Sequence, residues 1–485
     1  MTRVLRLRNA EGAAQAALPV LSVAEFRDAV LRAVAAGARV AALFGEPSDA
    51  GEVRLVAVLA HGEEASLALV ATRAAGRWPA LTPECPQVHA FEREVAEQCG
   101  LALVGHPWPK PLRAPEATGF FRIDGEEVHE VAVGPVHAGV IEPGHFRFQC
   151  HGEEVLHLEI ALGYQHRGVE RALVGGPDKR SVHHAETLAG DTSIGHAIAY
   201  CQTIEALAGC RVPPRAEALR AVALELERLA NHTGDLGALA GDVGYLPTAA
   251  FCGRLRGEFL GMTALVCGSR FGRGLVRPGG VGFDVEDARI GTLLERLDAA
   301  EREVRDAVGL LWEEPSVQSR FEDTGRLDRA TSEALGVVGL AARACGLERD
   351  VRSEFPSGLY RFAHIPVATW HTGDVFARAY LRWLEIERSV EFVREQLRTL
   401  PPGPTRAPRA PLAPDGVAVA LVEGWRGEIC HVALTDGCGR FARYKVVDPS
   451  FHNWMGLAMA LRGQEISDFP LCNKSFNLSY CGHDL

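Results

Sequence analysis

The chain has 485 residues, of which 47% are hydrophobic and 23% charged, as expected for a globular protein with a large buried core. Its 62 acidic residues outnumber its 51 basic residues, and the net charge of −11 argues against nucleic acid as a partner, because phosphates require a basic face. No stretch approaches the roughly 18–20 apolar residues that span a bilayer. The start of the chain lacks the apolar core of a signal peptide, so we expect a cytoplasmic location.

The cysteines argue against a metal or Fe–S site held by this chain alone. All twelve are scattered singly between Cys85 and Cys481, and none forms a C-x-x-C pair. Zinc sites and self-held Fe–S clusters need grouped thiolates. We therefore expect buried or free thiols in a reducing compartment.

The N-terminal part is predicted to be a small α/β domain. Residues 21–36 have helical periodicity, with Ser22 as the N-cap. Apolar, β-rich segments at 38–44 and 53–59 are predicted strands. Residues 45–51, which include two glycines and a proline, are predicted to form the turn between them.

A domain boundary is predicted near a proline-rich stretch. Residues 92–99 favour a short polar helix, and the three prolines of 105–111 prevent it from continuing. Beyond the boundary, residues 123–133 and 144–157 alternate in the manner of strands. The predicted domains are 1–115 and 116–485.

The second domain is predicted to be rich in helices, with a small sheet near its end. Long amphipathic helices are predicted at 215–239, 284–312 and 372–400. Residues 401–414 contain six prolines and are predicted to form an extended loop. Strands are predicted at 417–422, 428–434 and 441–446. The fold class is therefore α+β, with a small α/β domain followed by a helix-rich α+β domain.

The helix predicted at 372–400 carries regularly spaced charges. Asp374, Arg378, Arg382 and Glu385 are three or four residues apart and can pair along one face. Two interpretations remain open. The face forms a buried ion-pair network, or it is solvated or contacts another subunit.

Seven segments in order resemble one protein family. They are FEREV at 91–95, GHPW at 105–108, the stretch from 134 to 148, LGYQHRGVE at 162–170, RPGGV at 277–281, GDVFAR at 373–378 and DPSF at 448–451. The first two resemble the end of the 30-kDa-type subunit of respiratory complex I. The others resemble the 49-kDa-type subunit and the large subunits of membrane-bound [NiFe] hydrogenases of the formate-hydrogenlyase type. The chain is thus similar to a fusion of the two subunit types.

The resemblance implies a membrane-attached complex on the inner face of the cell membrane. A small subunit would carry a [4Fe–4S] cluster beside a deep cavity in this chain, and antiporter-like membrane subunits would translocate ions. Electrons would pass from the cluster to a quinone or another small acceptor in the cavity. Two alternatives are a non-catalytic scaffold subunit and a [NiFe] hydrogenase.

The positions that hold nickel in the family carry other residues here. Nickel and iron need four thiolates. The corresponding positions in this chain are occupied by Ala189, Thr192, Ser479 and Gly482, with Cys481 one residue out of register. We therefore expect no nickel–iron centre.

The quinone-binding residues that the resemblance implies are only partly present. Asp242 matches the family aspartate, while the family tyrosine falls at Gly190. The family histidine falls near Pro143, two residues before His145. A histidine that tunes the partner cluster falls at Gly272. Ordinary quinone reduction is therefore in question.

The candidate site residues each have a simpler structural alternative. Asp242, His137, Asp191, Thr192 and His196 are cavity candidates, together with Glu186, Cys481 and His483. Arg277 and Arg270 are candidates for a position near the partner's cluster, where a fixed positive charge raises the reduction potential. His137 and Arg277 could instead stabilise turns, and Asp191 and Asp242 could cap a turn or a helix.

Overall fold

The computed structural model describes residues 3–47, 51–113, 119–137 and 141–485. Its N-terminal part is a sheet with the strand order β1-β6-β5-β4, to which β3 adds in parallel beside β6. These strands are β1 (Leu5–Leu7), β3 (Val20–Leu21), β4 (Arg39–Pro47), β5 (Val53–His61) and β6 (Ser66–Ala74). The helices α1 (Val23–Ala35) and α2 (His89–Cys99) and the short pair β7 (Arg77–Pro79) and β8 (Ala102–Val104) complete it. The domain boundary predicted at 115/116 lies outside the described residues.

The first predicted helix is confirmed, and its start has the expected cap. The Ser22 hydroxyl accepts from the backbone N–H of Glu25, and the Glu25 carboxylate accepts from the backbone N–H of Ser22. The predicted turn at 45–51 is wrong in its first half, because β4 continues to Pro47, which pairs with Val53. Gly45 serves packing instead, since a Cβ there would lie 2.5 Å from the sulfur of Cys99 in α2.

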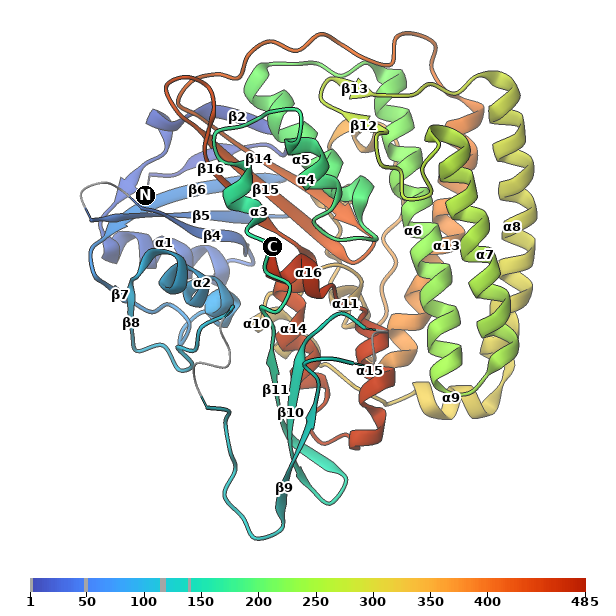
Figure 1. Cartoon of the computed structure of the whole chain (residues 1–485), viewed down its shortest axis with the longest axis horizontal. Coiled ribbons are helices and arrows are strands. Elements are labelled where there is room, and N and C mark those ends of the chain that lie inside the picture. Colours follow the sequence, from blue (N-terminus) through green and yellow to red (C-terminus); the bar gives the residue numbers. More distant parts are fainter. Residues whose placement is uncertain (1–2, 48–50, 114–118, 138–140) are drawn as a thin grey trace.

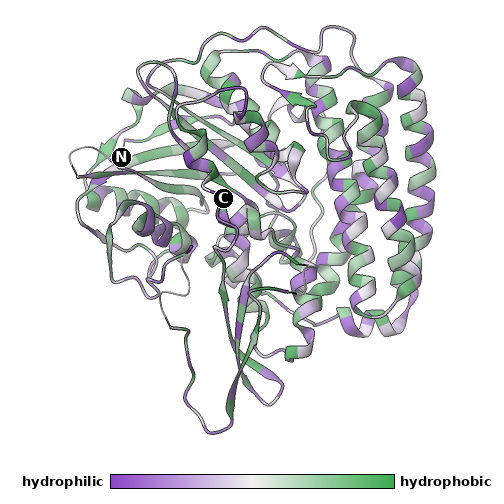
Figure 2. Ribbon diagram, in the orientation of Figure 1, coloured by the Kyte–Doolittle hydropathy of each residue, from purple (hydrophilic) through white to green (hydrophobic). Residues whose placement is uncertain are grey.

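A second sheet lies in the middle of the molecule (Figure 1). Its order is β16-β15-β14-β2, with β14 (Gly416–Gly424), β15 (Gly427–Thr435), β16 (Phe441–Val447) and β2 (Glu11–Ala14). Alternate residues of β14 pack into two different cores: Val419 faces the N-terminal core and Ala418 the core of the helical part. Burial on both faces explains the continuous apolar run of residues 417–422 in β14. The central strands are mostly green in Figure 2.

A bundle of long helices packs beside this sheet (Figure 1). The predicted helices are confirmed as α6 (Pro214–Asp242), α8 (Asp287–Glu313) and α13 (Val375–Arg398). Two more were not predicted, namely α5 (Ser193–Ala208) and α7 (Leu246–Cys267). α6 contacts both α7 and α13, while α5 covers β14 and β15. These elements confirm the α+β class.

The remaining elements frame the site. β9 (Val128–Val133), β10 (His145–His151) and β11 (Glu154–Ala161) form an arm that projects from the body (Figure 1). The chain ends with α14 (Pro449–Ala460), α15 (Phe469–Phe476) and α16 (Tyr480–Asp484). The other short elements are α3 (Val169–Leu173), α4 (Ser181–Glu186), β12 (Val276–Arg277), β13 (Gly280–Val281), α9 (Pro315–Phe321), α10 (Arg329–Ala334), α11 (Gly339–Ala344) and α12 (Val351–Glu354). Among the described residues, no helix has both the length and the apolar character that a membrane span requires.

Candidate functional site

A cavity of about 610 Å³ lies between the base of the β9–β10 arm and the C-terminal helices. Its wall includes the apolar side chains of Phe146, Phe148, Phe469 and Leu478. Polar side chains also line it, among them His137, Asp191, Arg426, Asn473, Lys474 and Tyr480. An apolar wall with a few polar groups is the usual composition of a small-molecule site.

An ion pair between Asp191 and Arg426 forms part of the cavity lining. Nη1 and Nη2 of Arg426 donate to the two carboxylate oxygens of Asp191 at 2.6 and 2.8 Å. The guanidinium also lies over the Trp425 ring, 3.9 Å from its centroid. Burial alone would raise the pKa of Asp191, but Arg426 outweighs it and holds the pKa below its usual range. The lining therefore carries a fixed, charged pair at neutral pH.

Backbone and side-chain contacts hold Arg426 on its other side. Its Nε donates to the carbonyl oxygen of Asn477, and the Asn477 amide donates to Asp235. Nε of Arg382 donates to the second oxygen of Asp235 at 2.8 Å. Hydrogen bonds from Arg382 through Asp235 and Asn477 to Arg426 thus connect α13 to the cavity lining.

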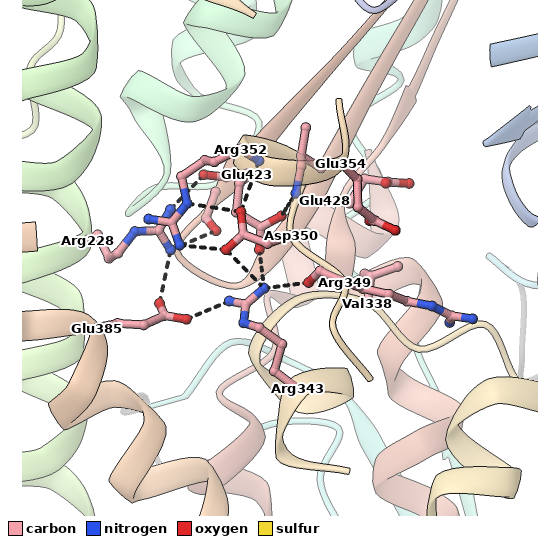
Figure 3. A network of polar contacts seen from close by, with 12 residues as sticks. Arg228, Val338, Arg343, Arg349, Asp350, Arg352, Glu354, Glu385, Glu423 and Glu428 are labelled. Carbon is pink, nitrogen blue, oxygen red and sulfur yellow. Dashed lines mark hydrogen bonds and ion pairs between the residues drawn. The ribbon is translucent and has the colours of Figure 1, made fainter. Parts of the chain in front are cut away.

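The turn that presents Arg426 is anchored by a buried network of charges. Figure 3 shows Arg228, Arg343 and Glu385 among its members. Arg343 pairs with Glu385 at 2.6 Å and with Glu423 at 2.8 Å. Arg228 donates to the carbonyl oxygens of Glu423 and Gly424, the two residues that end β14. The network therefore fixes the strand end from which Arg426 follows.

The charged face of α13 is buried. Asp374, Arg378, Arg382 and Glu385 are each at most 3% exposed, so the alternative of a solvated or subunit-facing helix is wrong. Asp374 caps the helix by accepting from the N–H of Ala377 at 2.8 Å. Arg382 and Glu385 belong to the networks that hold the site.

The two segments that correspond to the nickel-binding motifs lie close together. Arg167 donates to the carbonyl oxygens of both Leu188 and Cys481. The Thr192 hydroxyl accepts from the indole N–H of Trp425 at 3.1 Å, and a Cβ on Gly482 would lie 2.7 Å from Cγ of Asp448. In the described part of the chain, no group of three or more His, Cys, Asp or Glu side chains is placed to hold a metal ion. Ala189, Thr192, Ser479 and Gly482 offer no thiolate, so the side chains at these positions do not fit a nickel–iron centre.

A second polar row runs behind the cavity lining. Nε2 of His196 lies 3.1 Å from the Asp448 carboxylate, and Nδ1 of His196 lies 3.1 Å from Nε2 of His431. Nδ1 of His431 lies 2.9 Å from the Tyr444 hydroxyl. Burial, together with the charge of His196, holds the pKa of His431 well below its usual range.

The predicted cavity residues separate into two groups. Asp191 and His137 line the cavity, and Nε2 of His137 also contacts the carbonyl oxygen of Gly144 at 2.7 Å, as a turn-stabilising histidine would. Asp242 ends α6 and accepts from Lys474, which lines the cavity, at 3.2 Å. Arg270 borders a small hollow that also contains Asp191.

Other predicted residues lie elsewhere. His196 and Thr192 are buried and are not part of this cavity's lining; the Thr192 hydroxyl contacts Arg426, and His196 contacts Asp448 and His431. Glu186 is also absent from that wall, since it pairs with Arg277 at 2.8 Å. His483 and Cys481 do not line the cavity either; His483 borders a separate hollow beside the N-terminal domain.

The residues that the sequence analysis missed are Arg426, Asp448, His431 and Tyr444. Two of these residues could have been recognised from the sequence. His431 stands within a continuous apolar strand, where a buried imidazole needs a partner. Arg426 follows Gly424-Trp425 in a tight turn between two fully buried strands, which directs its charge to a defined place.

Comparisons with known proteins give the family. Residues 242–414 and 409–484 match the family described as respiratory-chain NADH dehydrogenase, 49 Kd subunit. The chain is 33% identical over 350 residues to the carbon monoxide-induced hydrogenase of Rhodospirillum rubrum, covering 72% of this chain and 97% of that protein. It is 30% identical over 437 residues to formate hydrogenlyase subunit 5 of Escherichia coli, covering 83% and 76%.

A solved structure of the membrane-bound sulfane sulfur reductase, an archaeal respiratory membrane complex, has the same fold. The TM-score is 0.70 at 24% identity, over 75% of this chain and all of that one. The chain belongs to the family of the 49 kDa subunit of the respiratory-chain NADH dehydrogenase. The resemblance inferred from the seven segments is thereby confirmed, and the relatives are subunits of respiratory complexes and hydrogenases.

Proposed function

We propose that the chain is the cavity-forming large subunit of an oxidoreductase complex attached to the inner face of the cell membrane. A small subunit with a [4Fe–4S] cluster supplies electrons to a quinone or another small acceptor in the cavity. Antiporter-like membrane subunits couple this reduction to ion translocation. The proposal rests on family membership and on one observation, the guanidinium of Arg426 fixed in the lining of the cavity.

The chemistry of the cavity fits an acceptor that gains negative charge on oxygen. A quinone takes up two electrons and two protons to become a quinol, and charge develops on its oxygens between these steps. A preorganised cation in a water-poor site stabilises such charge strongly. Arg426 is held by Asp191, Asn477 and Trp425, so it needs no rearrangement during the reaction.

Tyr480 supports a hydrogen-bonding role for the same cavity. Its side chain is 4% exposed, and its hydroxyl has no hydrogen-bond partner of good geometry among the described residues, although Asn473 lies beside it. Burial raises the pKa of this phenol to about 12, so it stays protonated and able to donate. The family tyrosine is replaced by Gly190, and a Cβ at Gly190 would meet nothing within 4 Å.

A scaffold role is favoured by one specific observation. Asp191 and Arg426 satisfy each other, so the lining is stable without a ligand. The two proposals differ in what happens when Arg426 is replaced. A catalytic cavity loses turnover, whereas a scaffold retains any activity of the complex.

The test uses the complex purified through a tag on this chain from gently solubilised membranes. Mass spectrometry identifies the partners, and reduction of decylubiquinone by an artificial low-potential donor is measured. Arg426→Gln is expected to lower turnover by about 10²-fold, the effect of removing one oxyanion-stabilising donor. Arg440→Gln, which removes a surface arginine paired with Asp436, is the matched control.

Either of two results would overturn the catalytic proposal. One is a wild-type complex that contains the partners but reduces no quinone or other small acceptor, which leaves the scaffold role. The other is unchanged turnover in a correctly assembled Arg426→Gln complex. If the chain purifies without partner subunits, the proposal that it belongs to a complex fails.

A further inference from the structure

Four polar side chains form a continuous buried row that acceptor binding does not use. Asp448, His196, His431 and Tyr444 are each 0% exposed. They come from the start of α14, from α5, from β15 and from β16, so four separate elements converge on the row. The three successive distances are 3.1, 3.1 and 2.9 Å.

Both nitrogens of both imidazoles are engaged within the row. A neutral imidazole has one donor and one acceptor nitrogen. When Tyr444 donates to His431, His431 can donate to His196, and His196 to the Asp448 carboxylate. After each proton moves one place, every hydrogen bond points the other way and the chain of contacts is still complete. This is the arrangement that passes a proton along a line of side chains.

One end of the row lies directly behind the proposed site. Asp448 stands against Gly482, in the segment that resembles the late nickel-binding motif. Its charge interacts with Arg426 and Asp191, both of which line the cavity. Asp448 therefore lies within electrostatic reach of the ion pair in the cavity lining.

The other end approaches a hollow that opens to solvent. The rings of Tyr444 and Tyr200 are 6.1 Å apart, and Tyr200 lines a hollow of about 840 Å³. The exposed side chains of Lys179 and Arg409 border the same hollow. The Thr203 hydroxyl also interacts with that of Tyr444.

We infer that this row carries protons from the solvent-exposed hollow to the cavity when the acceptor is reduced. The inference rests on the proposed function, which supplies the electrons from the partner's cluster and consumes the protons at the acceptor. For one proton, the N–H bond at Nε2 of His196 breaks and an O–H bond forms on Asp448. His431 then protonates Nδ1 of His196, and Tyr444 protonates Nδ1 of His431. Water in the hollow restores the phenol proton, and Asp448 passes its proton to the reduced acceptor. Both imidazoles then hold their proton on Nδ1, and both must return to the Nε2–H tautomer before a second proton follows.

Several charged or titratable groups surround the row and set its proton affinity. Burial alone would raise the pKa of Asp448, but His196 and Arg426 outweigh it and hold the pKa below its usual range. The titratable side chains nearest the row are those of Asp191, His452, Cys201, Cys430 and Tyr200. A substitution in the row should therefore change the pH dependence of turnover.

The decisive variant is His431→Gln, whose amide keeps hydrogen bonds but cannot pass a proton through a ring. In the purified complex, decylubiquinone reduction should fall by at least about 10²-fold, the usual contribution of a positioned proton donor. KM should stay unchanged, and the pH profile and the solvent deuterium isotope effect should change. Tyr444→Phe keeps the ring packing and should act in the same direction. His106→Gln, a buried histidine with both nitrogens engaged in the N-terminal domain, is the control.

The outcomes separate the two proposals. If the wild-type complex reduces no acceptor, the proposed function fails. If it does, and both His431→Gln and Tyr444→Phe keep the wild-type rate and pH profile, the proton path is overturned. A measurement that needs no turnover is nitrogen-15 NMR of the histidine-labelled full chain. His196 and His431 should change protonation together, and two rings fixed in one tautomer at every pH would contradict the path.

Discussion

The Cα of Gly427 lies 2.2 Å from the place where a Cβ on Gly339 would stand. The two glycines, one at the start of α11 and one at the start of β15, therefore pack backbone against backbone. Both have positive φ, +66° and +138°, a region that side chains disfavour. This contact fixes the turn that carries Arg426, in addition to the charge network on its other side.

Gly427→Ala should both destabilise the protein and displace Arg426. The strained backbone alone costs about 1–3 kcal/mol, and the clash with Gly339 adds to it. Gly190→Ala is the matched control, because a Cβ there meets nothing within 4 Å, and it should change stability by about 0.5 kcal/mol or less. Urea unfolding measures both variants. Equal stability of the two would mean that the glycine contact does not hold the turn.

Arg426→Gln should make the protein less stable at neutral pH, because it leaves the Asp191 carboxylate without its partner. Removing one member of a fully buried pair costs about 3–5 kcal/mol. The effect should be smaller here, about 2 kcal/mol, because the Asp191 side chain is 33% exposed. The double variant Asp191→Asn with Arg426→Gln should be more stable than Arg426→Gln alone. Additive losses in this double-mutant cycle would rule out the coupling.

The same pair sets a pH dependence with a defined sign. The pKa of Asp191 is lowered in the folded state, so its stabilising contribution is present above its ordinary pKa of 3.8 and is lost as the pH falls through the lowered value. Arg426→Gln should abolish this loss, so that its unfolding free energy declines less on acidification than that of the wild type. A decline identical in both proteins would contradict this assignment.

Glu227 should produce the opposite pH dependence. Burial raises its pKa from 4.5 to about 8, against the lowering effect of hydrogen bonds from the N–H groups of Ile194 and Gly195. The folded state therefore binds more protons than the unfolded state in this window, and stability falls as the pH rises through it. Glu227→Gln should remove a slope of up to roughly 1.4 kcal/mol per pH unit. Unfolding free energies of Glu227→Gln and the wild type, measured near pH 4.5 and near pH 8, test this prediction. The same pH dependence in both proteins would contradict it.

The parts of the fold that could be predicted from sequence are those with a clear one-sided pattern. α8 and α13 have an apolar stripe, and Ser22 caps α1 as expected. α5 was missed because nearly all of its residues are buried, which removes the contrast between faces. α7 lacks a clear apolar stripe for a different reason, since apolar residues such as Leu246 and Phe251 are exposed.

A site residue could be predicted from the sequence only where a single family motif identifies it. Asp191 was found through its place in a family motif, but its partner Arg426 is 235 residues away in the β14–β15 turn. The row from Asp448 to Tyr444 likewise joins four elements, one of them the unpredicted α5. Such pairings depend on how the central sheet and α5 pack, and no local sequence pattern indicates them. Family register placed His196 near the cavity, yet only the structure shows it turned toward His431.

Restoring the four cysteines should not restore a nickel site. The variant with Ala189→Cys, Thr192→Cys, Ser479→Cys and Gly482→Cys supplies the thiolates that nickel prefers. However, a Cβ at Gly482 would stand 2.7 Å from Cγ of Asp448, so that cysteine cannot enter unless the Asp448 side chain moves. The Arg426 guanidinium, 3.2 Å from the Thr192 hydroxyl, would also repel a metal dication.

We therefore expect far less than one nickel per chain after anaerobic incubation of the reduced variant with Ni²⁺ and removal of free metal. Elemental analysis gives the content, and circular dichroism shows whether the variant is folded. A second variant that also carries Arg426→Ser and Asp448→Ala removes both obstacles and should bind more nickel than the first. Stoichiometric nickel in the four-cysteine variant alone would show that Arg426 and Asp448 do not block these positions.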